Sequence, residues 1–285
     1  MPTADIDGLA TRYELVGDGP PLLMFSPGGF DARLENWRTL GLYKKTRILE
    51  QVAKNYTCIT FDRREAGQSG GRVQRITWQD YAAQGKGLLD HLGIARAYVA
   101  GGCAGCSVVT EFAVRYPGAT AALVLLSPAG GARYRIRQQE RFTRHLAFVA
   151  ERGLAGVAEL ARSSGQAFGQ DPRVGPWGTV VARDESFAVA YAARDQRLYE
   201  ATVAAMARTL FDRDTVPGPE PEDLMGLALP ALIVPGQDAS HATSAARYLQ
   251  ECLPGAQYWD VPVSAQDEVT LPAQVLEFLD SVSPG

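Results

Sequence analysis

The sequence of 285 residues lacks the features that mark membrane, secreted or nucleic-acid-binding proteins. No stretch reaches the roughly 18–20 apolar residues that cross a membrane, and residues 1–13 have no apolar run of the signal-peptide kind. Four cysteines in a chain of this length do not make a disulfide framework. A formal net charge of −4 argues against a nucleic-acid partner, because such proteins usually carry a basic surface. We therefore expect a soluble, cytoplasmic protein with reduced thiols that binds neither membrane nor nucleic acid.

Short apolar runs alternate with helix-patterned segments, which is typical of an α/β protein. Most runs are apolar on consecutive residues, as expected for parallel strands buried on both faces. We predict strands at 21–26, 58–62, 97–102, 122–127, 231–235 and 257–261. Helical patterns cover 78–92, 107–116, 245–253 and 272–282. The alternation stops at 131–219, where we expect helices only, and where 13 Arg outnumber 10 Asp and Glu.

One turn carries the strongest chemical signal. The run at 97–102 leads directly into a helical segment through Gly101-x-Cys103-x-Gly105. This is the pattern of a nucleophile elbow, in which small flanking residues allow a strained turn that exposes the nucleophile at a helix N-terminus. The helix dipole favours a thiolate at Cys103, and the N–H of Ala104 would face a developing oxyanion. The same residues also form a CxxC with Cys106, so a redox dithiol and a buried structural cysteine are alternative interpretations.

Together with this turn, three other segments resemble the α/β-hydrolase superfamily, most closely its capped branch of proline iminopeptidases, C–C bond hydrolases and esterases. The first, residues 26–30, resembles the oxyanion loop, and the second, residues 62–69, resembles the D-x-R-G-x-G-x-S turn with Glu65 in place of a glycine. The third is the turn at 235–238. The resemblance implies a mostly parallel sheet of the eight-stranded type, flanked by helices. It divides the chain into a core of residues 1–130 and 220–285, and a helical cap of residues 131–219 inserted after the sixth strand.

The resemblance also implies roles for single residues. Gly29 would donate the second N–H of the oxyanion hole, and Asp238, in the Pro-Gly-Gln-Asp turn at 235–238, would be the catalytic acid. We expect Phe30 and Trp177 to contact the substrate, although such aromatic residues more often fill a small core. The resemblance implies no cofactor and no metal.

The catalytic histidine is where the sequence departs from the superfamily, because no histidine follows residue 241. Gln266 stands near the usual place and cannot act as a base. We predict that His241 is the base, with its pKa lowered by a helix N-terminus. A resemblance to little-characterised capped relatives with a Gly-Gly-Cys elbow and an Asp-x-x-His turn supports this pairing. Asp267 or Glu268 in the base position is the alternative. His91 and His145, the other two histidines, are expected to be structural.

The sequence therefore predicts a hydrolase in which Cys103 attacks the carbonyl of an ester, thioester, lactone or C–C substrate through an acyl-enzyme. Transfer of the acyl group to another acceptor stays open. A second hypothesis keeps the fold without covalent chemistry, as a cyclase, lyase, isomerase or cofactor-free oxygenase of secondary metabolism. A third is a ligand-binding module without activity. The expected partner is a small-molecule substrate, and a homodimer is left open.

Overall fold

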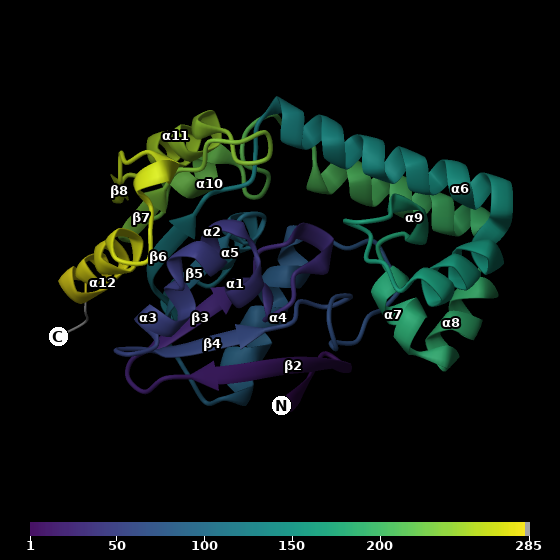
Figure 1. Ribbon diagram of the computed structural model, residues 1–285, viewed down its shortest axis with the longest axis horizontal. Helices are drawn as coiled ribbons and strands as arrows, with labels where there is room; N and C mark the ends of the chain where they lie inside the picture. The colour runs from purple at the N-terminus through teal and green to yellow at the C-terminus, as the bar shows by residue number, and fades with distance from the viewer. Residues whose placement is uncertain (283–285) are drawn as a thin grey trace.

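The computed structural model describes residues 1–282 and contains one eight-stranded sheet (Figure 1). The strands are β1 (Thr3–Ile6), β2 (Leu9–Val16), β3 (Pro21–Phe25), β4 (Thr57–Phe61), β5 (Ala97–Gly102), β6 (Thr120–Leu126), β7 (Ala231–Val234) and β8 (Ala256–Tyr258). Their order is β1-β2-β4-β3-β5-β6-β7-β8. β2 pairs antiparallel with β1 and β4, and all other pairs are parallel. The predicted fold class is confirmed.

The two strands β1 and β2 were not predicted from the sequence. β1 has a single buried residue, and along β2 the two buried residues are separated by a half-buried one. An antiparallel edge that faces water on one side does not produce the continuous apolar runs used to find the other strands. The six predicted strands are present, the last one shortened to β8.

The helices between β3 and β4 were also not predicted. They are α1 (Asn36–Thr39), α2 (Gly41–Thr46) and α3 (Ile48–Val52). The longer helices are α4 (Trp78–His91), α5 (Gly105–Arg115), α6 (Ala132–Ser164), α9 (Gln196–Leu210), α11 (Thr243–Cys252) and α12 (Thr270–Ser281), and the shorter ones are α7 (Gly178–Arg183), α8 (Glu185–Ala192) and α10 (Pro221–Met225). Helices of one or two turns have too few residues to show an apolar period, which is why the sequence did not predict α1 to α3.

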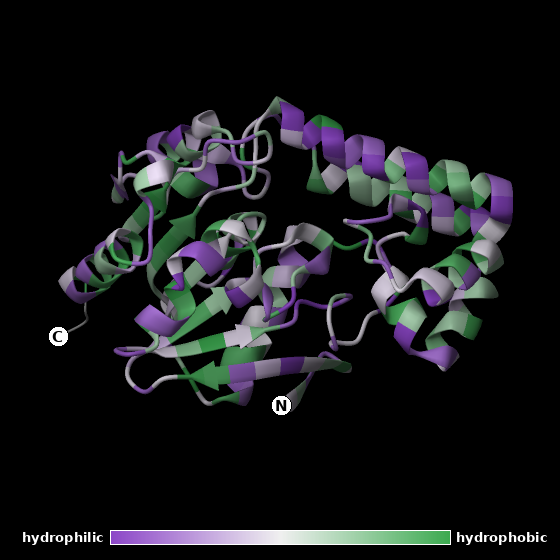
Figure 2. Ribbon diagram, viewed as in Figure 1, coloured by the Kyte–Doolittle hydropathy of each residue, from purple (hydrophilic) through white to green (hydrophobic). Residues whose placement is uncertain are grey.

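Each face of the sheet is covered by apolar helix faces, and Figure 2 shows the strands β3 to β7 mostly in the hydrophobic colour. On one face, Val108 and Phe112 of α5 and Leu88 of α4 are fully buried. On the other, Leu49 of α3 and Phe278 of α12 close a second core. Burial on both faces fixes the sheet, so the loops at its carboxyl edge are held by a rigid frame.

Helices α6 to α9 contain no strand between them and lie beside the sheet (Figure 1). They are attached to the rest of the chain partly through aromatic contacts: the ring of Phe30 meets Phe142 at 5.5 Å, Phe168 at 5.2 Å and Phe211 at 6.3 Å. In residues 1–282, no helix is both long enough and apolar enough to span a bilayer.

Candidate active site

Cys103 lies in the turn between β5 and α5, at the carboxyl edge of the sheet. Its φ of 56° is in the left-handed region that non-glycine residues rarely adopt. Neighbouring glycines make the turn possible, because a Cβ on Gly101 would lie 2.6 Å from the carbonyl of Gly105, and one on Gly105 would lie 2.4 Å from the carbonyl of Phe25. The strained residue is therefore the one that carries the thiol, as the elbow pattern predicts.

Asp238 and His241 share one loop, between β7 and α11. The Asp238 carboxylate accepts hydrogen bonds from the backbone N–H groups of Ser240, at 2.7 Å, and His241, at 3.0 Å. Its second oxygen lies 2.8 Å from His241 Nδ1. A carboxylate can only accept, so Nδ1 carries the proton and Nε2 is the free or titrating nitrogen.

The second ring nitrogen of His241, Nε2, faces the thiol of Cys103. Nε2 is buried and bonds no oxygen or nitrogen within residues 1–282. The group that it contacts is the thiol of Cys103. The backbone of the His241 loop is fixed on both sides, because Gly130 N–H donates to the carbonyl of Ser240 at 3.0 Å and a Cβ on Gly236 would lie 2.4 Å from the Cβ of His241. Cys103, His241 and Asp238 thus form a continuous chain of polar contacts.

The ionisation of Cys103 and His241 is coupled. Burial alone would raise the pKa of Cys103, but the hydrogen bond and charge of His241, with the N–H groups of Ala104 and Gly28, lower it below the usual thiol value. Burial would likewise lower the pKa of His241, yet Cys103 and Asp238 together raise it to about 9. The expected lowering of this pKa by a helix N-terminus is therefore wrong, because two adjacent anionic groups outweigh a dipole. Both shifts favour the thiolate–imidazolium form of the pair.

Two backbone N–H groups point at the sulfur, from Ala104 and from Gly28. The expected donor of the oxyanion loop was Gly29, one residue later. The structure instead places Gly28 in the cavity wall at Cys103. Gly28 has a φ of 117°, which only glycine adopts readily, and its N–H donates to the thiol. The carbonyl of Gly29 accepts a hydrogen bond from the Arg63 guanidinium and takes part in fixing the loop.

Asn36 holds the peptide group that carries the Gly28 N–H. Its side chain is 1% exposed, and its Nδ2 donates to the carbonyl of Pro27 at 2.8 Å and to that of Asp31 at 2.6 Å. The Pro27 carbonyl and the Gly28 N–H belong to the same planar peptide. The hydrogen bond from Asn36 therefore fixes the direction in which the N–H points.

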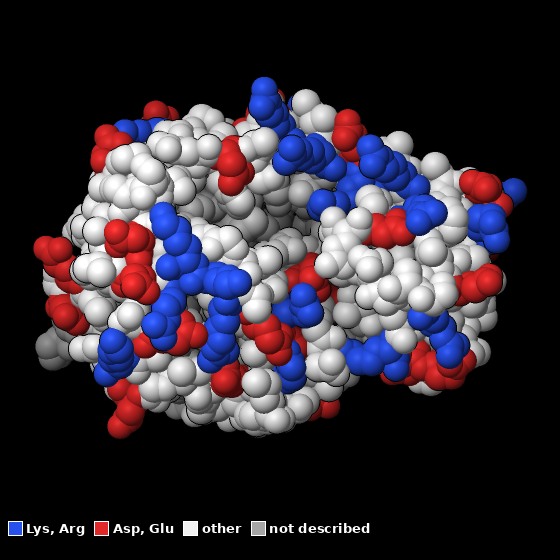
Figure 3. All heavy atoms as spheres, in the orientation of Figure 1, with Lys and Arg blue, Asp and Glu red and all other residues white. Residues whose placement is uncertain are grey.

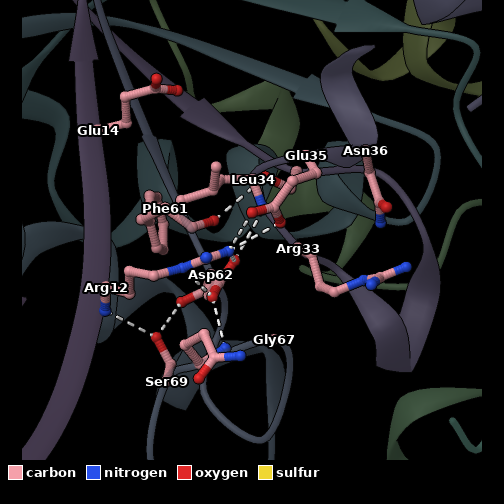
Figure 4. A network of polar contacts seen from close by, with 12 residues as sticks. Arg12, Glu14, Arg33, Leu34, Glu35, Asn36, Phe61, Asp62, Gly67 and Ser69 are labelled. Carbon is pink, nitrogen blue, oxygen red and sulfur yellow. Dashed lines mark hydrogen bonds and ion pairs between the residues drawn. The ribbon is translucent and has the colours of Figure 1, made fainter. Parts of the chain in front are cut away.

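Asn36 is in turn positioned by a buried polar network around Asp62 (Figure 4). The Asp62 carboxylate, which is fully buried, accepts hydrogen bonds from Arg12 Nε at 2.7 Å and from the backbone N–H of Leu34 at 2.9 Å. A second Arg12 nitrogen lies 2.6 Å from Glu35. These contacts fasten the segment before α1 to β2 and to the end of β4. The aspartate of the D-x-R-G-x-G-x-S turn is thus structural.

Cys103 opens into a cavity of about 410 Å³. Figure 3 shows a hollow in the face of the molecule between the sheet domain and α6. Most of the cavity wall is apolar. Besides Cys103, its residues come from five places in the chain: the oxyanion loop, α2 with the residue before it, the residue after β6, the loop after β7 and the loop after β8. They include Pro27, Leu40, Leu42, Tyr43, Lys45, Ser127 and Val263. No residue between 131 and 219 is part of this wall.

Phe30 and Trp177, the expected substrate contacts, do not line the cavity. Trp177 is fully buried, and its Nε1 donates to the carbonyl of Arg72 at 2.9 Å. Phe30 is 7% exposed and packs among phenylalanines of the helical segment. For both rings the alternative interpretation applies, that aromatic residues fill a small core. The walls of the cavity come instead from the short helix α2, which the sequence did not predict.

The alternative base candidates lie elsewhere. Asp267 accepts hydrogen bonds from the N–H groups of Val269 and Thr270, both at 2.9 Å, and so caps the start of α12. Glu268 is exposed and is not part of the cavity wall. Gln266 is fully buried and donates to the carbonyl of Pro235 at 3.0 Å. It fills the usual histidine position with a structural amide.

The remaining candidates are structural. His145 is fully buried and bonds the carbonyl of Arg173 at 3.0 Å and the Tyr199 hydroxyl at 2.6 Å. His91 packs its ring near Tyr13, with centroids 5.9 Å apart. Cys106 is buried, and burial raises the pKa of its thiol well above the usual value, which opposes a redox dithiol with Cys103. Within residues 1–282, no cluster of three or more His, Cys, Asp or Glu side chains could hold a metal ion.

Comparison with known proteins agrees with this architecture. Residues 21–148 match the family described as "alpha/beta hydrolase fold". The enol-lactonase from Burkholderia xenovorans has a similar structure, with a TM-score of 0.62, 19% identity, and coverage of 98% of this chain and 100% of that one. The meta-cleavage product hydrolase from Pseudomonas fluorescens is comparable, with a TM-score of 0.62, 18% identity, and coverage of 99% and 98%. At these identities the likeness shows the fold. The family match and the structural likeness agree that the chain has the α/β-hydrolase fold.

One curated relative is also similar in sequence, the dihydrolipoyllysine-residue acetyltransferase component of the acetoin cleaving system of Cupriavidus necator. It is 32% identical over 127 residues, which are 45% of this chain and 32% of that protein. The match therefore spans about a third of the relative's length.

Proposed function

We propose that this protein is a hydrolase in which Cys103 is the nucleophile, His241 is the general acid and base, and Asp238 orients and charges His241. One observation carries the proposal: a strained cysteine meets a histidine nitrogen that has no other partner, and two backbone N–H groups point at the same sulfur. The base and the anion donors thereby converge on the sulfur of the nucleophile, and Asp238 orients the base from its other nitrogen, as attack on a carbonyl requires.

In the first step, the Cys103 thiolate attacks the carbonyl carbon of the substrate, and the carbonyl oxygen becomes an oxyanion. The N–H groups of Gly28 and Ala104 donate hydrogen bonds to this oxygen. When the tetrahedral intermediate collapses, the bond to the leaving group breaks, and protonated His241 transfers its Nε2 proton to that group. Cys103 is left as a thioester.

In the second step, neutral His241 removes a proton from water, and the resulting hydroxide attacks the thioester carbonyl. Collapse of this intermediate releases a carboxylic acid and returns the thiolate of Cys103 beside imidazolium His241. An alcohol, amine or thiol in place of water would give acyl transfer. The names of structural neighbours, an enol-lactonase and a thermophilic esterase among them, support ester-like carbonyl substrates.

The test is intact-protein and peptide mass spectrometry after brief incubation with p-nitrophenyl acetate. The wild type should gain one acetyl group on Cys103, and Cys103→Ala should gain none. His241→Ala should form or clear the adduct at least about 100-fold more slowly, as expected for loss of a general acid and base. Cys252→Ala is the control, because Cys252 is buried in α11 away from the cavity wall. Equal labelling of all four cysteines, or an unaltered adduct rate in His241→Ala, would overturn the proposal.

A further inference from the structure

The cavity at Cys103 has one unusual feature, a single basic side chain in a wall that is otherwise mostly apolar. Of the residues that form the wall, only Lys45 carries an ammonium or guanidinium group. The wall has one carboxylate, that of Asp238, and it is already engaged by His241 and by two backbone N–H groups. Lys45 is therefore the one cationic group of the wall that is left over for a ligand.

Lys45 has no strong partner of its own. Its Nζ makes two long contacts, at 3.5 Å to the carbonyl of Val263 and at 3.4 Å to that of Ser264. Within residues 1–282, no carboxylate lies within 4 Å of it. Asp267 is near enough for the two charges to influence each other, but its oxygen atoms cap α12. An ammonium with only long contacts to carbonyls retains donor capacity for a charged acceptor.

The helix that carries Lys45 is fixed with respect to Cys103. Tyr43, two residues earlier on α2, is 6% exposed and donates its hydroxyl to the carbonyl of Leu126 at 3.2 Å. Its ring is pressed against the strand that leads to the elbow, since a Cβ on Gly102 would lie 2.7 Å from it. The backbone of Lys45 is thus held in register with the nucleophile, and only its flexible side chain needs to adjust.

We infer that the cavity takes an acyl group that ends in a carboxylate, and that Lys45 binds this carboxylate while the reacting carbonyl lies at Cys103. The inference rests on the proposed function for the chemistry at Cys103. The apolar wall, which includes Leu40, Leu42 and Val263, suits the methylene chain between the two ends. The predicted substrate class is therefore a half-ester or half-thioester of an aliphatic dicarboxylic acid.

A protection experiment tests the binding part without requiring turnover. Cys103 is alkylated with iodoacetamide in the presence of increasing adipate or hexanoate, which have the same chain length and differ in one terminal carboxylate. Because both acids carry a carboxylate that can enter the site of the reacting carbonyl, the difference reports on the second one. Adipate should protect at about 10- to 100-fold lower concentration, the range expected for a hydrogen bond between charged groups. In Lys45→Met the two acids should protect alike.

The catalytic part uses the p-nitrophenyl half-ester of adipic acid and p-nitrophenyl hexanoate, with spontaneous hydrolysis subtracted. The wild type should prefer the half-ester by about 10- to 100-fold in kcat/KM, and Lys45→Met should lose this preference because its kcat/KM for the half-ester falls toward that for the hexanoate. Lys45→Arg should keep part of the preference. Lys44→Met removes the same charge from the neighbouring residue, which is exposed and outside the wall, and should behave as wild type.

The outcomes separate the two proposals. Equal protection by adipate and hexanoate in the wild type, or an equal loss of both rates in Lys45→Met, would overturn the role of Lys45 as a carboxylate site. The same change in Lys44→Met would also overturn it, because the effect would then be one of general charge. Failure of Cys103 to form an acyl adduct overturns the proposed function, whereas selective protection by adipate would still support the binding site.

Discussion

The peptide group between Pro27 and Gly28 offers the sharpest test of the oxyanion geometry. Its carbonyl is held by Asn36 Nδ2 at 2.8 Å, and its N–H points at Cys103. Replacing Asn36 by alanine removes this hydrogen bond and the one to the carbonyl of Asp31, at 2.6 Å. The peptide is then free to rotate away from the thiol, although no group that touches the substrate has been changed.

The magnitude follows mainly from the Pro27 carbonyl, because the carbonyl of Asp31 still accepts a hydrogen bond from the N–H of Arg33 at 2.9 Å. A buried carbonyl left without a donor costs about 1–3 kcal/mol, so the free energy of unfolding of Asn36→Ala should fall by about that amount, less if water enters the vacated space. Complete loss of one oxyanion donor costs about 100- to 1000-fold in rate. Because Asn36 acts through the Gly28 peptide, which keeps other supports, we expect about a 10- to 100-fold loss in the rate of Cys103 acylation.

Two reactions of the same thiol separate orientation from general damage. Acylation by p-nitrophenyl acetate passes through an oxyanion, whereas alkylation by iodoacetamide is a displacement at carbon that forms none. Asn36→Ala should therefore lose acylation rate and keep its alkylation rate within about threefold. Asn55→Ala serves as the control, since Asn55 is exposed and lies just before the start of β4, whereas the elbow follows the end of β5, which runs in the same direction. Urea unfolding confirms that each variant is folded under the assay conditions.

The reasoning would be refuted by an acylation rate in Asn36→Ala that matches the wild type. An equal fall in acylation and alkylation would refute it as well, because the defect would then lie in the thiol and not in the oxyanion hole. A loss of stability alone would assign Asn36 a purely structural role.

Three other predictions follow from the same site. In His241→Ala, the pH midpoint of Cys103 alkylation should rise, because His241 lowers the pKa of Cys103 and only the two backbone N–H groups then oppose the effect of burial; an unchanged midpoint would exclude the ion pair. Gly28→Ala should lose more than about 10-fold in acylation rate, because its Cβ would lie 2.4 Å from Asn36 Nδ2. Gly29→Ala should lose less, because its Cβ would meet no atom within 4 Å. The reverse order of the two rates would restore Gly29 as the oxyanion donor. Asp62→Ala should lower the free energy of unfolding by about 3–5 kcal/mol, because it leaves the donors of Arg12 and Leu34 without their acceptor. A change below about 1 kcal/mol in urea titration would contradict this role of Asp62.

The sequence predicted the parts of the site whose residues lie within a single turn. Cys103 was found because a glycine stands two residues away on each side, and the close contacts at Gly101 and Gly105 show why only small residues fit there. Asp238 and His241 were found as an Asp-x-x-His turn after an apolar run. In each case the chemistry is local, so neighbouring residues reveal it.

The parts that were missed depend on contacts between distant segments. Asn36 reaches back nine residues to Pro27 through a one-turn helix that has no apolar period. Lys45 enters the cavity because Tyr43 anchors α2 to a carbonyl 83 residues further along the chain. The choice between Gly28 and Gly29 depends on backbone dihedral angles, and two consecutive glycines give no sequence signal for it.

In the proposed mechanism the base lies in the loop after β7, which has a structural consequence for the whole site. Asp238 and His241 lie three residues apart, so their contact is set by one turn and does not depend on how two separate loops approach each other. The position after β8 no longer has to supply a base, and Gln266 closes it with a buried amide bonded to Pro235. Val263, three residues earlier, forms part of the cavity wall beside α2, where the Lys45 Nζ lies 3.5 Å from its carbonyl. The proposed catalytic chain is thus compact, and the loop after β8 contributes to the binding wall in place of a base.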